Sequence, residues 1–167
     1  MGYSQIYQDW QSDPEAFWMD AAKAIDWVKE PTFALNAAHD PLFEWYTDAK
    51  VNTCYNALDR HVQNGRADQT AIIYDSPMTD TKKHISYAEL LEQTAQLSGA
   101  LRARGVEKGD RVIIYMPMIP ETIVAMLACT RIGAIHSVVF GGFAANELAV
   151  RIDDASPKVI LSASCGL

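Results

Sequence analysis

The spacing of apolar residues in the second half of the chain predicts strands and helices in strict alternation. Three short apolar runs, at 111–116, 134–140 and 158–163, have the length of buried strands. Two helical patterns, at 120–131 and 145–155, occupy the segments between them. Short connections of this kind favour right-handed βαβ crossovers. We therefore expect an α/β fold in which these strands form a parallel sheet.

The middle of the chain predicts two strands and a long helix. Strand-like residues at 70–74 and 83–87 flank a turn-rich loop. Ser86 and Glu89 have the spacing of a capping box, in which each side chain accepts the backbone N–H of the other residue. The helix that they introduce is expected to stop at Gly105, because glycine adopts the left-handed conformation common at helix ends.

The first part of the chain predicts two helices with an extended segment between them. Ser12 and Glu15 have capping-box spacing, and apolar residues follow at helical spacing as far as Val28. Residues 31–50 contain prolines and scattered aromatic side chains without a clear period, which indicates an extended segment. A second helix is expected at about residues 53–64.

Charge and aromatic residues divide the chain at about residue 60. Residues 1–59 hold 3 Lys and Arg against 10 Asp and Glu, whereas residues 60–167 hold 11 of each. All 4 tryptophans also lie in the first part. We expect an acidic extension at 1–59, packed outside the parallel sheet, and the start of the α/β domain at 60–167. Nucleic acid is not an expected partner, since no basic stripe is present to bind phosphates.

Other residue types argue against several kinds of site. The 3 cysteines and 4 histidines show no metal-ligand spacing, and no nucleophile is paired with a base, so neither a metal site nor a catalytic residue is predicted. No apolar run reaches the roughly 18 to 20 residues of a membrane span, and the N-terminus lacks a signal-peptide pattern. We therefore expect a cytoplasmic protein with no membrane partner.

The stretch SVVFGGFAANEL, residues 137–148, contains a candidate binding loop. A predicted strand ends at Phe140, Gly141 and Gly142 follow, and a helical pattern begins after them. The stretch matches neither the dinucleotide fingerprint G-x-G-x-x-G nor the phosphate-binding loop, which needs a following Lys. Two interpretations remain. The glycines form only a turn between a strand and a helix, or they permit close backbone approach while Phe140 offers its ring to a flat ligand.

The pattern also indicates an incomplete sheet. A parallel sheet needs helices on both faces, yet no helix follows the predicted strand at 158–163. The helix at 120–131 has a nearly continuous apolar run, and we expect little within the chain to cover it. These features predict that the chain is the N-terminal part of a larger protein.

Long stretches of the chain resemble the AMP-forming short-chain acyl-CoA synthetases. The segment from GDRVIIYMPM to SPKVILSA, residues 109–163, is similar to the early part of their adenylation domain, and YQDWQSDPEAFWMDAAKAIDW, residues 7–27, is similar to their helical N-terminal extension. The resemblance covers essentially the whole chain and is closest to the propionate–CoA ligases, followed by the acetate–CoA ligases. It implies the start of an AMP-binding domain of parallel βαβ units, preceded by a mainly helical extension.

The resemblance implies a two-step activation of a short-chain carboxylate. ATP, with Mg²⁺, and the acid give an acyl-adenylate and pyrophosphate, and the thiol of CoA then displaces AMP. The family's phosphate loop and catalytic lysine do not occur in these residues, so we expect the isolated chain to be inactive and to hold no bound cofactor. Phe140, Gly141 and Gly142 match the family loop that lies against the adenine end of CoA.

A second class of function remains open. The alternative is a standalone CoA-binding or interaction module that derives from the front half of a ligase. A continuation past Leu167 with a Gly-rich loop and a Lys favours the ligase, whereas a stop codon at that point favours the module.

Overall fold

The computed structural model describes residues 2–142 and 144–164, and the chain divides into two compact units between Asn52 and Thr53. We call the part up to Asn52 the N-terminal unit and the part from Thr53 onward the C-terminal unit. Each unit has its own packing and is described by itself.

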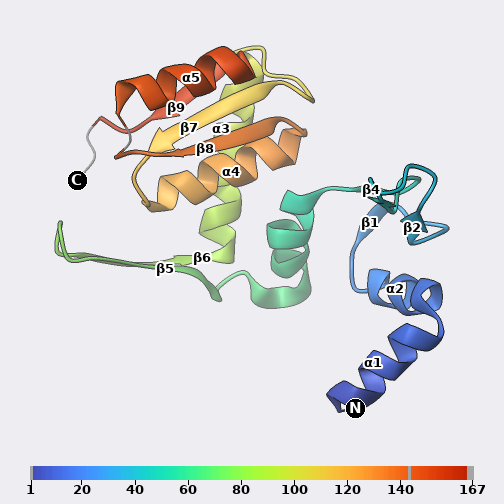
Figure 1. The fold of residues 1–167 in the computed structure, drawn as a ribbon. Coiled ribbons are helices and arrows are strands. Elements are labelled where there is room, and N and C mark those ends of the chain that lie inside the picture. The colour runs from blue at the N-terminus through green and yellow to red at the C-terminus, as the bar shows by residue number, and fades with distance from the viewer. Residues whose placement is uncertain (1, 143, 165–167) are drawn as a thin grey trace. The chain divides into compact units, whose positions relative to one another are not determined.

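A three-stranded parallel sheet forms the centre of the C-terminal unit (Figure 1). β7 (Arg111–Met116) lies in the middle, with β8 (Ile135–Phe140) on one side and β9 (Val159–Ser162) on the other. β7 pairs in parallel with both neighbours. The predicted α/β class and parallel sheet are therefore confirmed, although the apolar pattern does not predict that β7 is the central strand.

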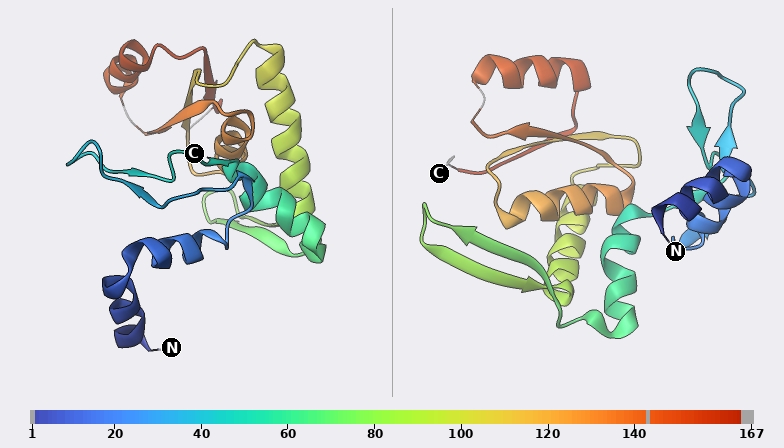
Figure 2. Two further views of the ribbon diagram at one scale, coloured as in Figure 1. Left: turned by 90° about the vertical axis from the view of Figure 1, so that its right-hand side faces the viewer. Right: turned by 60° about the horizontal axis from the view of Figure 1, so that its bottom comes forward.

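The two crossover helices lie on opposite faces of this sheet (Figures 1 and 2). α4 (Pro120–Ile132) joins β7 to β8, and α5 (Ala145–Ala155) joins β8 to β9 on the far side of β7. Right-handed crossovers that run in opposite directions along a sheet place their helices on different faces. α3 (Tyr87–Ala103) packs beside α4, so two helices cover one face and α5 covers the other.

Alternate side chains of β7 face these two layers, as expected of a strand. Val112, Ile114 and Met116 pack in the clusters that contain α3 and α4 side chains, and Val112 shares its cluster with Leu101. Ile113 points to the opposite face and is also fully buried. A strand buried on both faces explains why its sequence is a continuous apolar run rather than an alternating one.

The apolar helix α4 is covered within the chain, contrary to the expectation from the sequence. Its buried side chains pack in clusters with α3, with the sheet and with Leu58 of the segment before β5. Ser98 of α3 also donates its hydroxyl to the carbonyl oxygen of Ala128 at 3.2 Å. Within α4, all of which the structure describes, every residue except Glu121 is buried or half-buried. The prediction that little within the chain covers this helix was therefore wrong, and the apolar run of α4 does not support the prediction of a larger protein.

The strands before α3 and the start of that helix agree with the sequence prediction. β5 (Thr70–Ser76) and β6 (Thr81–Ser86) form an antiparallel pair separate from the parallel sheet. The Ser86 hydroxyl accepts the Glu89 backbone N–H at 3.2 Å, and the Glu89 carboxylate accepts the Ser86 N–H at 2.7 Å, which confirms the capping box. Gly105 follows the helix with φ +79°, the left-handed conformation expected there.

The helix expected at about residues 53–64 is present and includes π-helical turns in η1 (Tyr55–Asp59) and η2 (Val62–Arg66). The helix is interrupted within η2, because Asn64 and Gly65 have non-helical backbone angles and Gly65 is left-handed with φ +80°. Cys54 and Leu58 are buried in a cluster with side chains of β6, α3 and α4. This packing places the segment in the C-terminal unit.

Two fully buried threonines differ in whether their hydroxyl group makes a hydrogen bond. Among the described residues, the Thr94 hydroxyl has no hydrogen-bond partner, whereas the Thr122 hydroxyl donates to the Pro117 carbonyl oxygen at 2.7 Å. Valine replaces the hydroxyl with a methyl group. Thr94→Val should therefore raise the free energy of unfolding by about 1 kcal/mol, and Thr122→Val should lower it by about 1–2 kcal/mol. Urea unfolding measures both changes, and changes of the same sign would contradict the assignment.

The N-terminal unit begins with two short helices instead of the single long helix that was predicted. α1 (Tyr3–Ser12) and α2 (Pro14–Ala22) are separated at Asp13, whose carboxylate caps α2 by accepting a backbone N–H at 2.9 Å. The predicted capping box of Ser12 and Glu15 is wrong. Ser12 ends α1, and Glu15 accepts a backbone N–H from the segment after α2.

The predicted helix also ends earlier than the apolar spacing suggested, because Val28 lies in a strand. Residues 31–50 were predicted to be extended, but many of them form turns and bends between short strands that take part in two antiparallel pairs. The pairs are β1 (Trp27–Lys29) with β4 (Lys50–Val51) and β2 (Leu35–Asn36) with β3 (Glu44–Trp45). The four tryptophans lie in α1, α2, β1 and β3, outside the parallel sheet.

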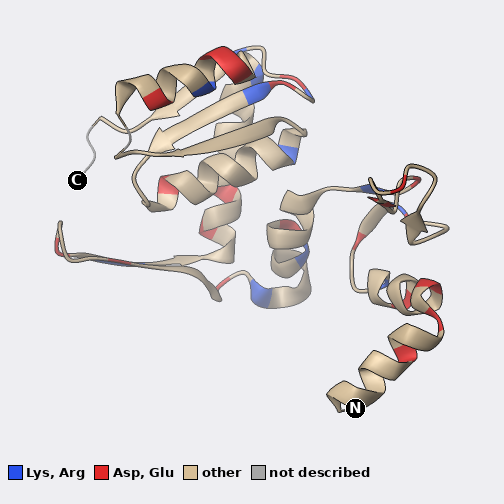
Figure 3. Ribbon diagram, viewed as in Figure 1, with Lys and Arg blue, Asp and Glu red and all other residues tan. Residues whose placement is uncertain are grey.

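Aromatic contacts join α2 to these strands. Trp18 and Trp45 meet edge to face with ring centroids 5.3 Å apart, and the Tyr46 hydroxyl donates to the Trp18 carbonyl oxygen at 2.9 Å. The Trp27 indole N–H donates to the Ala22 carbonyl oxygen at 2.8 Å. Figure 3 shows the acidic character of this unit, which has 3 Lys and 9 Asp and Glu up to Asn52. These rings, rather than a long apolar stripe, organise the unit.

Candidate functional site

β7 and β8 end where the chain leaves the sheet toward opposite faces. The segment after Met116 leads to α4, and the segment after Phe140 leads to α5 on the other face. Met116 and Phe140 are register partners, so the two exits lie at the same level of the sheet. Open parallel sheets commonly bind ligands outside the carboxyl ends of strands at such a switch in direction. We call residues 117–119 and 140–142 the carboxyl edge.

Gly141 lies directly against the end of β7. A β-carbon added at Gly141 would be 2.9 Å from both the carbonyl carbon of Met116 and the nitrogen of Pro117. These are backbone atoms, which cannot turn aside as the end of a side chain can. Glycine is therefore required here for close approach of two main chains, and the group approached is the neighbouring strand rather than a ligand.

Gly142 lies under the ring of Phe140. A β-carbon at Gly142 would be 2.7 Å from Cε1 of that ring, so the ring folds back onto the loop that follows it. Phe140 is nevertheless 59% exposed. The loop thus presents an aromatic surface beside glycine backbone at the carboxyl edge.

The neighbouring loop between β7 and α4 is a tight turn. The Ile119 N–H donates to the Pro117 carbonyl oxygen at 2.8 Å, and the Thr122 hydroxyl donates to the same oxygen at 2.7 Å. These two hydrogen bonds hold the turn at the start of α4. Met118 lies at its tip and is 66% exposed, a feature that the sequence pattern did not single out.

Arg131, near the C-terminal end of α4, forms a bidentate ion pair with Asp59 that the sequence did not predict. Its Nη1 and Nη2 atoms lie 2.7 and 3.0 Å from the carboxylate oxygens of Asp59, and Nη1 lies 3.6 Å from Sγ of Cys54. The hydrogen bonds that Arg131 donates to Asp59 raise the pKa of Arg131. Burial raises the pKa of the Cys54 thiol, while Arg131 opposes that change. The group joins α4 to η1 and has the character of a structural link.

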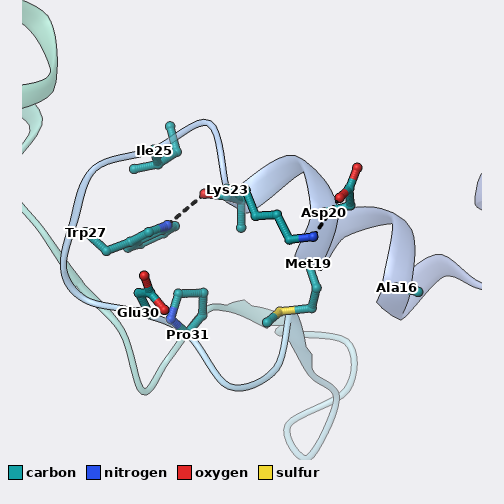
Figure 4. A pocket seen from close by; sticks show the side chains of 9 residues that line it. Ala16, Met19, Asp20, Lys23, Ile25, Trp27, Glu30 and Pro31 are labelled. Atoms are coloured by element: carbon teal, nitrogen blue, oxygen red, sulfur yellow. Dashed lines mark hydrogen bonds and ion pairs between the residues drawn. The ribbon is translucent and has the colours of Figure 1, made fainter.

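The N-terminal unit contains a cavity of about 630 Å³ beside α2 (Figure 4). Its lining combines the apolar side chains of Met19, Ile25 and Trp27 with an exposed ion pair between Asp20 and Lys23 at 2.9 Å. None of the site residues predicted from the sequence lines this cavity.

The described ranges, 2–142 and 144–164, contain no group of three His, Cys, Asp or Glu side chains that could hold a metal ion. No helix within them is both long and apolar enough to cross a membrane.

Comparison with known families shows that the chain belongs to the AMP-binding enzyme family, which matches residues 58–165. Residues 3–57 match the acetyl-coenzyme A synthetase N-terminus. The boundary between the two matches, at residues 57 and 58, lies within η1, and together the matches cover nearly the whole chain. The resemblance to short-chain acyl-CoA synthetases stated from the sequence is confirmed.

Individual relatives are similar along almost all of the chain. The mitochondrial acyl-CoA synthetase short-chain family member 3 of Mus musculus is 56% identical over 156 residues, which are 93% of this chain and 23% of the relative. The acetyl-coenzyme A synthetase of Bradyrhizobium diazoefficiens is 48% identical over 168 residues, which are 99% of this chain and 26% of the relative. The chain thus spans about a quarter of the length of these relatives.

Proposed function

We propose that this chain is the N-terminal part of an AMP-forming short-chain acid–CoA ligase. The ligase converts a carboxylate and ATP, with Mg²⁺, to an acyl-adenylate and pyrophosphate, and then transfers the acyl group to CoA with release of AMP. Family membership and the names of the relatives support this proposal. Within the chain, residues 1–59 are the extension and residues 60–167 begin the adenylation domain.

The observation that carries this proposal is the exposed Phe140 ring at the carboxyl edge, where ligands of parallel sheets commonly bind. Gly141 packs against the end of β7 beside it, and the ring folds back over Gly142. We propose that Phe140, Gly141 and Gly142 contact the adenine end of CoA. A base that stacks on an aromatic ring gains about 1–3 kcal/mol.

The phosphates of ATP are proposed to bind elsewhere in the ligase. The loop at 140–142 lacks the Lys and Ser or Thr that a phosphate-binding loop supplies. Its proposed role is therefore confined to the second substrate, CoA.

Propionate is the proposed acid, with acetate next, and the proposed location is the cytoplasm. The first choice is supported by the resemblance of the stretch from GGFA to VILSA to propionate–CoA ligases. A full-length ligase supplied with ATP, Mg²⁺, CoA and either acid should release AMP and form a thioester, with a higher kcat/KM for propionate. Release of ADP, or no thioester with either acid, would overturn the proposed reaction.

The 167-residue chain by itself should neither form acyl-CoA nor bind CoA measurably. Stacking on Phe140 supplies about 1–3 kcal/mol, whereas even a millimolar complex needs about 4 kcal/mol. Isothermal titration of CoA into the chain should therefore show no saturable heat. A micromolar dissociation constant would contradict this prediction and favour a standalone CoA-binding module.

A further inference from the structure

Met118 is an exposed apolar side chain on a firmly held loop. It is 66% exposed, while the residues on either side of it from 116 to 120 are buried or half-buried. The Pro117 carbonyl oxygen accepts hydrogen bonds from both Ile119 and Thr122, so the loop is fixed on both sides of Met118. The exposure of Met118 is therefore a property of the turn and is not explained by packing within the described chain.

The turn lies next to the loop proposed to contact CoA. Met116 and Phe140 are paired across β7 and β8, and Gly141 lies against the backbone of Met116 and Pro117. Met118 follows β7 as Gly142 follows β8, at the same end of the sheet. The structure thus places two exposed apolar side chains, those of Met118 and Phe140, on adjacent loops of one edge.

We propose that Met118 is a second apolar contact for the adenine ring of CoA, an inference that rests on the proposed function. A methionine side chain is unbranched and polarisable, and its sulfur makes favourable contacts with aromatic rings. A purine ring that stacks on Phe140 keeps another face and an edge for such a contact. Met118 is thus a binding residue for the nucleotide end of CoA and takes no part in the reaction at the thiol.

The full-length ligase with Met118→Ala should show a KM for CoA about two- to tenfold higher than the unchanged enzyme. Its kcat at saturating CoA should be unchanged, because the thiol is distant from the adenine ring. Met118→Leu should restore most of the affinity by restoring apolar contact. Met78→Ala is the matched control, since Met78 is 77% exposed in the loop between β5 and β6, and its KM should not change.

Pantetheine, which carries the thiol but lacks the adenine nucleotide, separates a direct contact from a structural effect. Its KM as acyl acceptor should be the same for Met118→Ala and the unchanged ligase. An equal rise in KM for pantetheine and CoA would overturn the inference. An effect of Phe140→Ala on the KM for CoA without any effect of Met118→Ala would also overturn it and leave the proposed function standing. No effect of either substitution would overturn the proposed CoA surface itself.

Discussion

Replacing Arg131 with alanine should lower the free energy of unfolding by about 3 kcal/mol. The Asp59 side chain is only 15% exposed, and the substitution removes the guanidinium group that donates to both of its carboxylate oxygens. A carboxylate left without its cation in a mostly buried position loses more than the attraction between the pair. The Arg131 side chain is itself 30% exposed, so the expected loss lies at the low end of the range for buried pairs.

A double-mutant cycle separates the ion pair from the loss of side-chain packing. Asp59→Ala and the double variant complete the cycle, and the double variant should lose clearly less stability than the sum of the two single variants. Lys82→Ala is the matched control, because Lys82 pairs with Asp75 at 2.9 Å while both side chains are more than half exposed. Its effect should stay within about 1 kcal/mol. Equal effects of Arg131→Ala and Lys82→Ala in urea unfolding would show that the pair is not a structural link.

The elements that the sequence predicted best depend on local patterns. β7 matches its predicted range, and α4 begins at the predicted proline. Both signals are local: a continuous apolar run specifies the strand, and a proline favours the first turn of a helix, without any contact to distant residues. The Ser86–Glu89 capping box is equally local. For the same reason, the strand–glycine–helix outline of the candidate site could be predicted, including the position of Phe140 at a strand end.

The features that the sequence did not predict depend on contacts between residues far apart in the chain, or on which of two similar adjacent residues takes a role. Arg131 and Asp59 are 72 residues apart, and nothing near Asp59 distinguishes it from the other acidic residues. Ser12 and Asp13 are both good caps, and the structure uses Asp13. Met118 could not be told from the buried Met116, because exposure at a turn depends on hydrogen bonds that the sequence does not display.

Replacing Phe140 with alanine should weaken CoA binding by the full-length ligase by about 1–3 kcal/mol, roughly 5- to 150-fold. The loss is expected because the substitution removes the ring and leaves the glycine backbone and the Gly141 contact in place. In the proposed reaction, formation of the acyl-adenylate precedes the entry of CoA. Exchange of pyrophosphate into ATP, which reports that first step, should therefore continue in the Phe140→Ala ligase.

Phe43→Ala is a control for the loss of an exposed aromatic ring, since Phe43 is 51% exposed. It should leave the KM for CoA unchanged. The decisive measurement is the comparison of pyrophosphate exchange with thioester formation at limiting CoA in the Phe140→Ala ligase. The proposed CoA surface predicts a loss of at least fivefold in thioester formation with exchange retained. Equal losses in the two half-reactions would contradict it and show that Phe140 supports the fold rather than CoA.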